Sequence, residues 1–344
     1  MNKPPKFILS RKKVLSQLKK IEKISDFVSY SFKTNPEVGK VLEKESECLF
    51  SLSSSGYIKS IRDKERIIFF AVAWDADEIK KLLKLKIRKF VVDNSADLKT
   101  LLDAIKGRNE KIWVFLRMKL KENTIYTGKH FVFGMGADEI NSAVEKIRGI
   151  KNIEKIGIHV HRKTQNISEW SLKDEISDSL DEKTLKSIYT LNIGGGLPSE
   201  YRNSNPNEES ILKKINELRE WLNKKGIMLI VEPGRFIAAP SIKLVAHIKS
   251  IFERNIVLDC SVYNSCMDTF VMNIRLLIDG ETDEEHGKAY VVKGCTPDSI
   301  DIFRYKVFLK NPKIGDEIVF LNAGAYNFAS DFDGLKKIPT EIIG

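Results

Sequence analysis

The feature that most constrains this chain is an alternation of short apolar runs with amphipathic stretches, from about residue 26 to residue 238. The apolar runs cover residues 27–32, 48–52, 66–72, 89–92, 112–116, 153–160, 188–193 and 227–231. Helical spacing of apolar residues recurs at 77–85, 95–105, 137–147, 172–180 and 208–224. Short strands that alternate with helices indicate parallel strands joined by right-handed crossovers. About eight such units predict an α/β fold built on a TIM-like (β/α)8 barrel.

The alternation stops after about residue 236, where apolar runs follow one another without long helices between them. These runs cover residues 241–252, 255–258, 270–278, 289–292, 305–309 and 317–321. Turns such as Asp279-Gly280 separate them, which is typical of antiparallel strands. We therefore predict a barrel in residues 26–238 and a mostly antiparallel β domain in residues 239–344. Residues 1–25 add a strand and a helix, and we expect that strand to join the β domain.

Composition excludes several classes of protein. No apolar run among the 344 residues reaches the length of a membrane span, and residues 1–5 lack the apolar segment of a signal peptide. We therefore expect a soluble, cytoplasmic protein. The four cysteines are scattered without a CxxC pair, so neither a disulfide framework nor a metal site is expected. The net charge is +10, but lysines interleave with glutamates along helices, which indicates a solvated surface rather than one that binds nucleic acid.

Polar and glycine residues follow the predicted strands, at the rim where a barrel of this kind holds its active site. These residues are Lys33, Asp93, Arg117 and His159, then the run Gly194-Gly195-Gly196 and the tetrad Glu232-Pro233-Gly234-Arg235. Lysine is rarely buried without a function, and a desolvated amine can form a Schiff base at neutral pH. Taken alone, Lys33 could equally extend out of a strand end and start a loop.

The glycine run and the tetrad point to one ligand. Bare glycine amides can approach a phosphate closely, although such runs also serve sharp turns. Glu232 ends an apolar strand, where a carboxylate needs a partner such as a protonated ring nitrogen. Arg235 can bind a phosphate, or it can form a structural ion pair with Glu232. With Lys33 to bind an aldehyde, these groups together match pyridoxal 5′-phosphate.

Motifs spread along nearly the whole chain resemble those of a known family. They are Tyr-Ser-Phe-Lys-Thr-Asn at 30–35, Asn-Ile-Gly-Gly-Gly-Leu-Pro at 192–198, Glu-Pro-Gly-Arg-Phe-Ile-Ala at 232–238, Gly-Cys-Thr-Pro-Asp-Ser-Ile-Asp at 294–301 and Gly-Ala-Tyr at 324–326. In this order they resemble the basic amino acid decarboxylases of the alanine racemase fold. That family includes the ornithine, lysine, arginine and diaminopimelate decarboxylases.

The resemblance implies a role for each matching residue. Lys33 is expected to bind the cofactor through a Schiff base, Glu232 to hold its pyridine nitrogen, and His159 to stack on its ring. Arg117 matches an active-site arginine. The residues expected to hold the phosphate, or to lie in the same motifs, are Gly194, Gly195, Gly196, Pro233, Gly234, Arg235 and Tyr326. Family members work as head-to-tail homodimers with shared active sites, in which Asp298 would bind the distal amine of the substrate in the partner's site.

The sequence departs from the family pattern in the motifs that bind substrate. Pro297 stands where the family has a cysteine that helps protonate the product, and Cys295 is the nearest candidate to replace it. A second acid usually stands at the position of Cys260. Asp259 is one residue early, and a one-residue slip in a strand turns the side chain to the other face.

Two further segments differ from the pattern. The sequence after the second strand, usually Asp-Cys-Ala-Ser, reads Ser51-Leu52-Ser53-Ser54. A serine that usually follows the sixth-strand histidine is missing, and the loop at 161–166 is basic instead. That loop could hold a phosphate, meet an anionic part of an unusual substrate, or simply face solvent.

We predict a pyridoxal-phosphate-dependent L-amino-acid α-decarboxylase, a carboxy-lyase. Because Asp298 favours a cationic distal group, the expected substrate is ornithine, lysine, arginine or a related small basic amino acid, and the expected setting is polyamine biosynthesis. Alternatives within the enzyme class are a diaminopimelate or carboxynorspermidine-type decarboxylase. A non-catalytic homologue that regulates polyamine synthesis is the alternative from another class, and the loss of the usual cysteine favours it. We expect no membrane or nucleic-acid partner.

Overall fold

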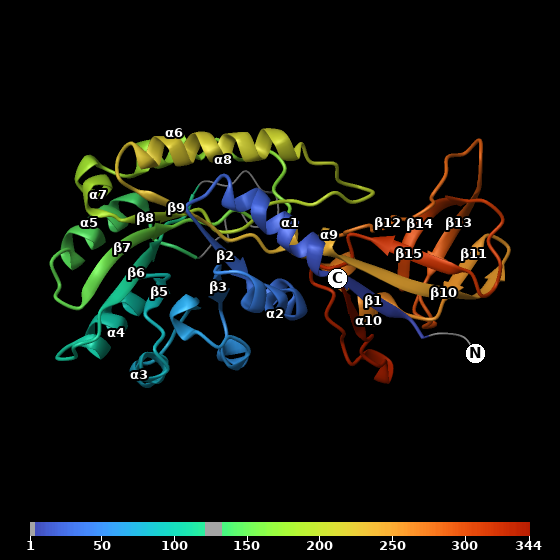
Figure 1. The fold of residues 1–344 in the computed structure, drawn as a ribbon, viewed down its shortest axis with the longest axis horizontal. Helices are drawn as coiled ribbons and strands as arrows, with labels where there is room; N and C mark the ends of the chain where they lie inside the picture. The colour runs from blue at the N-terminus through green and yellow to red at the C-terminus, as the bar shows by residue number, and fades with distance from the viewer. Residues whose placement is uncertain (1–3, 121–132) are drawn as a thin grey trace.

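The computed structural model describes residues 4–120 and 133–344, which form a barrel and a separate, mostly antiparallel sheet that lie side by side (Figure 1). The predicted fold class is therefore confirmed. Residues 1–3, part of the segment that argued against a signal peptide, lie outside the described residues. Within the two described ranges, no helix is both long and apolar enough to cross a membrane.

The barrel is closed by parallel strands, each paired with the next along the chain, and Phe27 of the first pairs with Ile230 of the last. Its strands are β2 (Phe27–Ser31), β3 (Leu49–Leu52), β4 (Ile67–Ala71), β5 (Lys89–Val92), β6 (Ile112–Arg117), β7 (Ile153–His159), β8 (Thr190–Asn192) and β9 (Met228–Val231). Each overlaps one of the predicted apolar runs. This agreement arises because strands buried on both faces are apolar throughout.

Helices cover the outside of the barrel (Figure 1). They are α2 (Pro36–Glu45), α3 (Ala76–Lys84), α4 (Ser95–Ile105), α5 (Ala137–Ile147), α6 (Leu172–Ser179), α7 (Glu182–Ser187), α8 (Glu208–Asn223) and α9 (Arg235–Ser241). Capping residues mark where two of these helices begin. The Asn35 side chain accepts hydrogen bonds from the Glu37 and Val38 amides at the start of α2, and Asp75 and Glu78 form a capping box at the start of α3.

Side chains fill the interior of the barrel below the strand ends. Ile68, Val91, Phe115 and Ile230, from four different strands, form an apolar cluster separate from the main core. Gly157 makes room for this layer, because a Cβ at that position would lie 2.6 Å from the Phe115 ring. The filled layer forms the floor on which the cavity described below rests, since Val91 also lines that cavity.

The second sheet is organised around the long strand β10 (Ile242–Phe252), which pairs antiparallel with three others. The remaining strands are β1 (Lys6–Ser10), β11 (Asn255–Leu258), β12 (Leu277–Ile278), β13 (Lys288–Lys293), β14 (Ile302–Leu309), β15 (Glu317–Leu321) and β16 (Thr340–Ile343). Lys6 of β1 pairs with Val245, so the N-terminal strand lies in this sheet. From β1 the helix α1 (Arg11–Glu22) leads to the barrel, where the buried Gln17 amide donates a hydrogen bond to the Phe236 carbonyl in α9.

The predicted strand at 270–278 is wrong for most of its length. The end of the short helix α11 (Asp268–Val271), which follows α10 (Val262–Ser265), takes up its first two residues, and only Leu277–Ile278 is a strand. The apolar residues of this segment do not all face one core, because Val271 is 68% exposed. Asp268, just before the predicted strand, is buried and forms an ion pair with Arg235 of the barrel. This tertiary contact holds the start of α11, which ends inside the predicted strand.

Candidate active site

A cavity of about 460 Å³ opens among the carboxyl ends of the barrel strands, within the range of about 300–1,000 Å³ typical of small-molecule sites. Most of the predicted cofactor residues line it: Lys33, Arg117, His159, Gly195, Gly196, Glu232, Gly234, Arg235 and Tyr326. Gly194 and Pro233 adjoin these residues in sequence without lining the cavity. Side chains that come from distant parts of the chain thus meet in one place, as the barrel topology requires.

Lys33 lies in a 3-10 turn, Phe32–Thr34, that follows β2. Its side chain is exposed in the single chain, so the argument from a buried lysine is wrong in its premise. The turn itself is held firmly. Phe32 is fully buried and packs on helix α2, where a Cβ at Gly39 would lie 2.5 Å from the Phe32 ring. The Asn35 amide donates to the Gly324 carbonyl at 2.8 Å, which ties this turn to the segment that carries Tyr326.

Glu232 is a buried carboxylate with two well-placed donors on one oxygen. Ser51 Oγ and Asn192 Nδ2 donate to Glu232 Oε1 at 2.7 and 2.8 Å. Ser51 Oγ also lies 2.7 Å from Ser29 Oγ, so a short hydroxyl chain supports this oxygen. The other oxygen, Oε2, lies 3.5 Å from His159 Nε2. This arrangement leaves Oε2 as the oxygen available to a ligand.

The protonation states of Glu232 and His159 suit a ligand with a cationic ring nitrogen. Burial alone would raise the pKa of Glu232, but the neighbouring His159 ring and the two donors on Oε1 outweigh burial and lower that pKa. Burial lowers the pKa of His159, so its ring is neutral at physiological pH. Both ring nitrogens of His159 are buried without a hydrogen-bond partner within the described residues. An ionised carboxylate beside a neutral ring is what a protonated pyridine requires.

The glycine run is needed first for close packing. A Cβ at Gly194, where φ is +64°, would lie 2.6 Å from the Val160 carbonyl oxygen. A Cβ at Gly195 or Gly196 would lie 2.9 Å from a backbone oxygen of a neighbouring segment. The Gly194 amide donates to Asn192 Oδ1 at 2.8 Å, and the Gly195 amide donates to His161 Nδ1 at 3.3 Å. Asn192 therefore connects the glycine run to Glu232.

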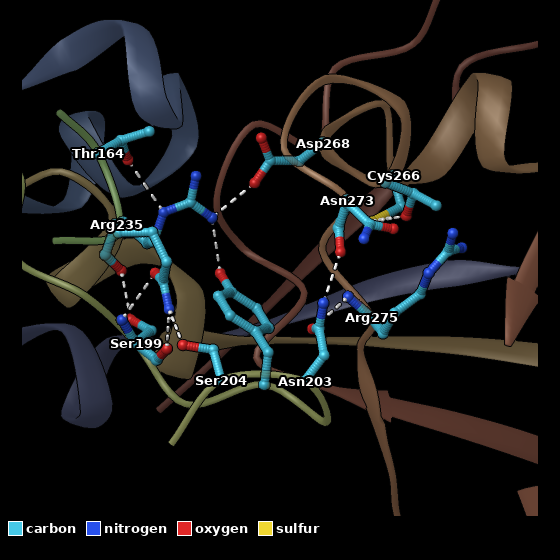
Figure 2. A network of polar contacts seen from close by, with 12 residues as sticks. Thr164, Ser199, Asn203, Ser204, Arg235, Cys266, Asp268, Asn273 and Arg275 are labelled. Carbon is cyan, nitrogen blue, oxygen red and sulfur yellow. Dashed lines mark hydrogen bonds and ion pairs between the residues drawn. The ribbon is translucent and has the colours of Figure 1, made fainter. Parts of the chain in front are cut away.

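Arg235 is held by residues from three parts of the chain (Figure 2). Its Nη1 donates to Tyr201 Oη at 2.9 Å and to Asp268 Oδ2 at 2.5 Å, and its Nε donates to Thr164 Oγ1 at 3.2 Å. Burial raises the pKa of Asp268 although Arg235 opposes that shift. The structural pair between Glu232 and Arg235 that the sequence left open is not formed, because Asp268 takes that place. Arg235 Nη2 is buried without a partner in the described part of the chain.

Two further predicted residues complete the cavity wall. Arg117 forms an ion pair with the buried Asp93 at 3.1 Å. Tyr326 adopts a left-handed backbone with φ of +50°, and its ring lies 5.1 Å from the Arg235 guanidinium. The backbone amide of Tyr326 donates to the Thr34 carbonyl at 3.0 Å, which keeps the tyrosine beside the lysine turn.

The predicted substrate-binding residues do not meet the cavity within this chain. The Asp259 carboxylate accepts hydrogen bonds from the backbone amide and Nδ1 of His247, both at 2.8 Å. Asp298 accepts from the Tyr263 hydroxyl, and this hydrogen bond lowers the pKa of Asp298. Cys295 is exposed, and partial burial raises the pKa of its thiol, so thiolate is scarce at neutral pH. Neither Cys295 nor Pro297 lines the cavity.

Sequence reasoning missed several residues that shape this site. Ser51 and Asn192 stand in segments that the sequence analysis quotes, but it gives neither residue a role at the site. Their place at the last or next-to-last residue of a barrel strand is the signal that would have found that role. Asp268 lies just before the predicted strand at 270–278 and gave no such signal.

The donor set fits pyridoxal phosphate. The cavity offers an amine, an ionised carboxylate with one oxygen unbound, and a guanidinium with one nitrogen unsatisfied. Unpartnered buried polar atoms are costly, so their position at one cavity indicates that a ligand satisfies them. Among the described residues, no group of three or more histidine, cysteine, aspartate or glutamate side chains could hold a metal ion.

Comparison with known proteins agrees with this fit. Residues 11–239 match the family model described as the pyridoxal binding domain of pyridoxal-dependent decarboxylases. The diaminopimelate decarboxylase of Zymomonas mobilis is 25% identical over 76% of this chain, and the alignment spans 66% of that protein, just under two thirds. The lysine/ornithine decarboxylase of Selenomonas ruminantium is 21% identical (92% and 83% covered), and antizyme inhibitor 2 of Xenopus laevis is 22% identical (95% and 77% covered).

The solved structures show the same fold. The arginine decarboxylase of Paramecium bursaria Chlorella virus, bound to agmatine, superposes with a TM-score of 0.81 at 21% identity, with 99% of this chain and 96% of that chain covered. The predicted resemblance is confirmed by the family match, and with it pyridoxal phosphate as the cofactor.

Proposed function

Because this chain belongs to the pyridoxal-dependent decarboxylases, which are carboxy-lyases, we propose that it removes the α-carboxylate of a basic L-amino acid as CO2. One observation carries the proposal: Lys33, Glu232 and Arg235 line a single cavity, with Glu232 ionised and Arg235 Nη2 unsatisfied. These are the groups that an aldehyde, a pyridine nitrogen and a phosphate need. When bound, pyridoxal phosphate supplies a sink for the electron pair of the broken bond.

The residues that line the cavity have separate roles in the proposed reaction. Lys33 would supply the amine that holds the cofactor through its aldehyde. Glu232 Oε2 would accept a hydrogen bond from the protonated pyridine nitrogen and so favour the cationic ring. The buried, neutral His159 offers a flat ring surface and excludes water from one side. Arg235 Nη2 would hold the phosphate, and Gly196 of the glycine run lines the same cavity.

We propose that the substrate end of the site is completed by a second copy of this chain, in a head-to-tail homodimer. Asp298 does not line the cavity of its own chain, although its carboxylate is ionised and oriented by Tyr263. The Tyr263 ring stacks on Phe332 at 4.0 Å, and Phe332 and Val271 are 43% and 68% exposed. Exposed apolar side chains around an oriented carboxylate are what a subunit interface would cover.

A cationic distal group fits this arrangement, so we propose ornithine, lysine or arginine as the substrate. The viral arginine decarboxylase structure, bound to agmatine, supports the class. Polyamine biosynthesis in the cytoplasm is the setting we propose. Diaminopimelate decarboxylase is the alternative within the class, because the Zymomonas mobilis relative has that name, but it would need a cation to bind the distal carboxylate of its substrate.

The test combines colour with turnover. Addition of pyridoxal phosphate should give a visible absorbance band that is absent from Lys33→Ala. Release of CO2 should then be measured with ornithine, lysine, arginine, diaminopimelate and carboxynorspermidine. Protein that stays colourless with added cofactor would sink the enzyme proposal. A band without turnover of any substrate would instead favour the second candidate.

That second candidate is a non-catalytic homologue that regulates polyamine synthesis. A specific observation favours it: Cys260, at the position of the usual second acid, is fully buried, and Asp259 is bound to His247. Antizyme inhibitor 2 of Xenopus laevis is among the relatives. The cavity with its complete set of cofactor groups opposes it, since a regulator has no need of that set.

A further inference from the structure

The basic loop at 161–166 contains residues engaged in the fold and two residues, His161 and Thr164, that line the cavity, and Thr164 accepts a hydrogen bond from Arg235. Arg162 is buried and forms ion pairs with Glu169 and Glu175. The Gln165 amide donates to the Ser199 carbonyl and to Ser204 Oγ, which fixes the neighbouring loop. These two side chains are therefore engaged in the fold. His161 differs from both, because it lines the cavity beside the glycine run.

His161 takes up an amide that a phosphate would otherwise use. The Gly195 N–H donates to His161 Nδ1 at 3.3 Å, and a Cβ at Gly195 would lie 3.6 Å from His161 Cε1. A ring nitrogen that accepts a hydrogen bond carries no proton in the neutral ring. The proton of His161 therefore lies on Nε2, which makes no hydrogen bond within residues 4–120 and 133–344.

The groups around the His161 ring favour the binding of an anion there. Burial first, and then His159, Arg117 and Lys33, lower the pKa of His161 to about 3, while Glu232 acts in the opposite direction. The ring stays neutral at physiological pH, so it adds a hydrogen-bond donor without adding charge. A neutral N–H donor beside the Lys33 and Arg117 cations suits an anionic oxygen, and its protonation state stays the same across the physiological pH range.

We propose that His161 is a cofactor-binding residue that relays the Gly195 amide to the ligand: the amide donates to Nδ1, and Nε2–H donates to an oxygen of the cofactor phosphate. This inference rests on the proposed function, because it assumes that the cavity binds pyridoxal phosphate. It places a contact with the ligand at a histidine two residues after His159, in the loop where the serine of the family pattern is missing.

The first test needs no catalysis. The full chain, labelled with nitrogen-15 in histidine, is studied by NMR without cofactor, and the His161 signals are assigned by their loss in His161→Gln. We expect the Nε2–H tautomer and no titration between about pH 5 and 8. Inorganic phosphate should shift the His161 signals, and acetate should not. An Nδ1–H tautomer, an imidazolium that forms near neutral pH, or an equal response to acetate would overturn the proposal.

The second test separates phosphate binding from ring binding. Affinities for pyridoxal phosphate and for pyridoxal, which lacks the phosphate, are measured by the absorbance of the bound form. His161→Leu should bind pyridoxal phosphate about 10-fold more weakly, the loss of one hydrogen bond to a charged group, with pyridoxal unaffected. His161→Gln, which keeps an acceptor and a donor, should recover most of the loss.

A matched control is His286→Leu, which removes an exposed histidine that contacts Asp283 in the β domain. It should leave both affinities unchanged. An equal loss of both ligands in His161→Leu, or no loss of either, would overturn the role of His161. Failure of the wild-type chain to bind either ligand would instead overturn the proposed function, so the two failures are distinguishable.

Discussion

Site residues were predicted both at the barrel mouth and in the segment at 259–301 of the β domain. The two regions differ in whether those residues meet at one cavity. At the barrel mouth, Ser51 of β3 and Arg235 of α9 line one cavity with Glu232, and Ser51 and Asn192 of β8 both donate to Glu232. In the second region, Asp298 lies outside the cavity and Asp259 is bound to His247. This difference supports our proposal that one chain binds the cofactor and that a second chain completes the substrate site.

The largest effect expected from this comparison is at Lys33. Lys33→Ala should abolish the cofactor absorbance band and reduce decarboxylation by about 10³-fold or more, because no other amine lines the cavity in the described chain. Spectra and CO2 release measure the two effects. Lys106→Ala, at an exposed position after α4, is the control and should behave as the wild type. A surviving band in Lys33→Ala would show that the cofactor is bound elsewhere.

The next effect concerns stability. Asp268→Asn leaves the buried Arg235 charge without its counter-ion, and the free energy of unfolding should fall by about 3–5 kcal/mol in the absence of cofactor. Urea unfolding measures this loss. Pyridoxal phosphate should stabilise Asp268→Asn more than it stabilises the wild type, because the phosphate then supplies the missing negative charge. Equal stabilisation of both proteins would show that Arg235 does not meet the phosphate.

A smaller effect is expected at Ser51, which supports Glu232 from the neighbouring strand. Ser51→Ala removes one donor to an ionised carboxylate, at a cost of about 1.5–3 kcal/mol in cofactor binding. The donor helps to lower the pKa of Glu232, so its removal should raise that pKa. The ionised form is present above the pKa and lost as the pH falls through it. The acid limb of the pH profile for cofactor absorbance should therefore move to higher pH, and Ser51→Thr should restore it.

The smallest expected effects distinguish Asp298 from Asp259, the two acids of the β domain. Asp298→Ala should raise KM by about 10-fold and leave cofactor affinity unchanged, since the residue is expected to contact only the substrate. Asp259→Asn should change neither value. It should lower the free energy of unfolding by about 1 kcal/mol, because it weakens the hydrogen bonds to His247. A rise of KM in Asp259→Asn alone would assign substrate binding to the other acid.

The barrel and its rim were predictable from the sequence for one physical reason. Parallel strands buried on both faces read as apolar runs, and the barrel topology then brings their carboxyl ends together, so Lys33, His159 and Glu232 could be grouped without coordinates. The contacts of Asp268 and Asp259 could not be predicted. Each depends on a partner from another element, Arg235 or His247, and no periodicity in the sequence reports such a pairing.

The most direct test of the central claim mixes two impaired chains. Lys33→Ala and Asp298→Ala are unfolded and refolded together in equal amounts, and decarboxylation is measured with saturating cofactor and with substrate well below KM, where Asp298→Ala alone should keep about a tenth of the wild-type rate. If each site joins Lys33 of one chain with Asp298 of the other, half of the dimers carry one intact site, and about a quarter of the wild-type activity should return. Activity no greater than the mean of the two parent proteins would contradict the shared site.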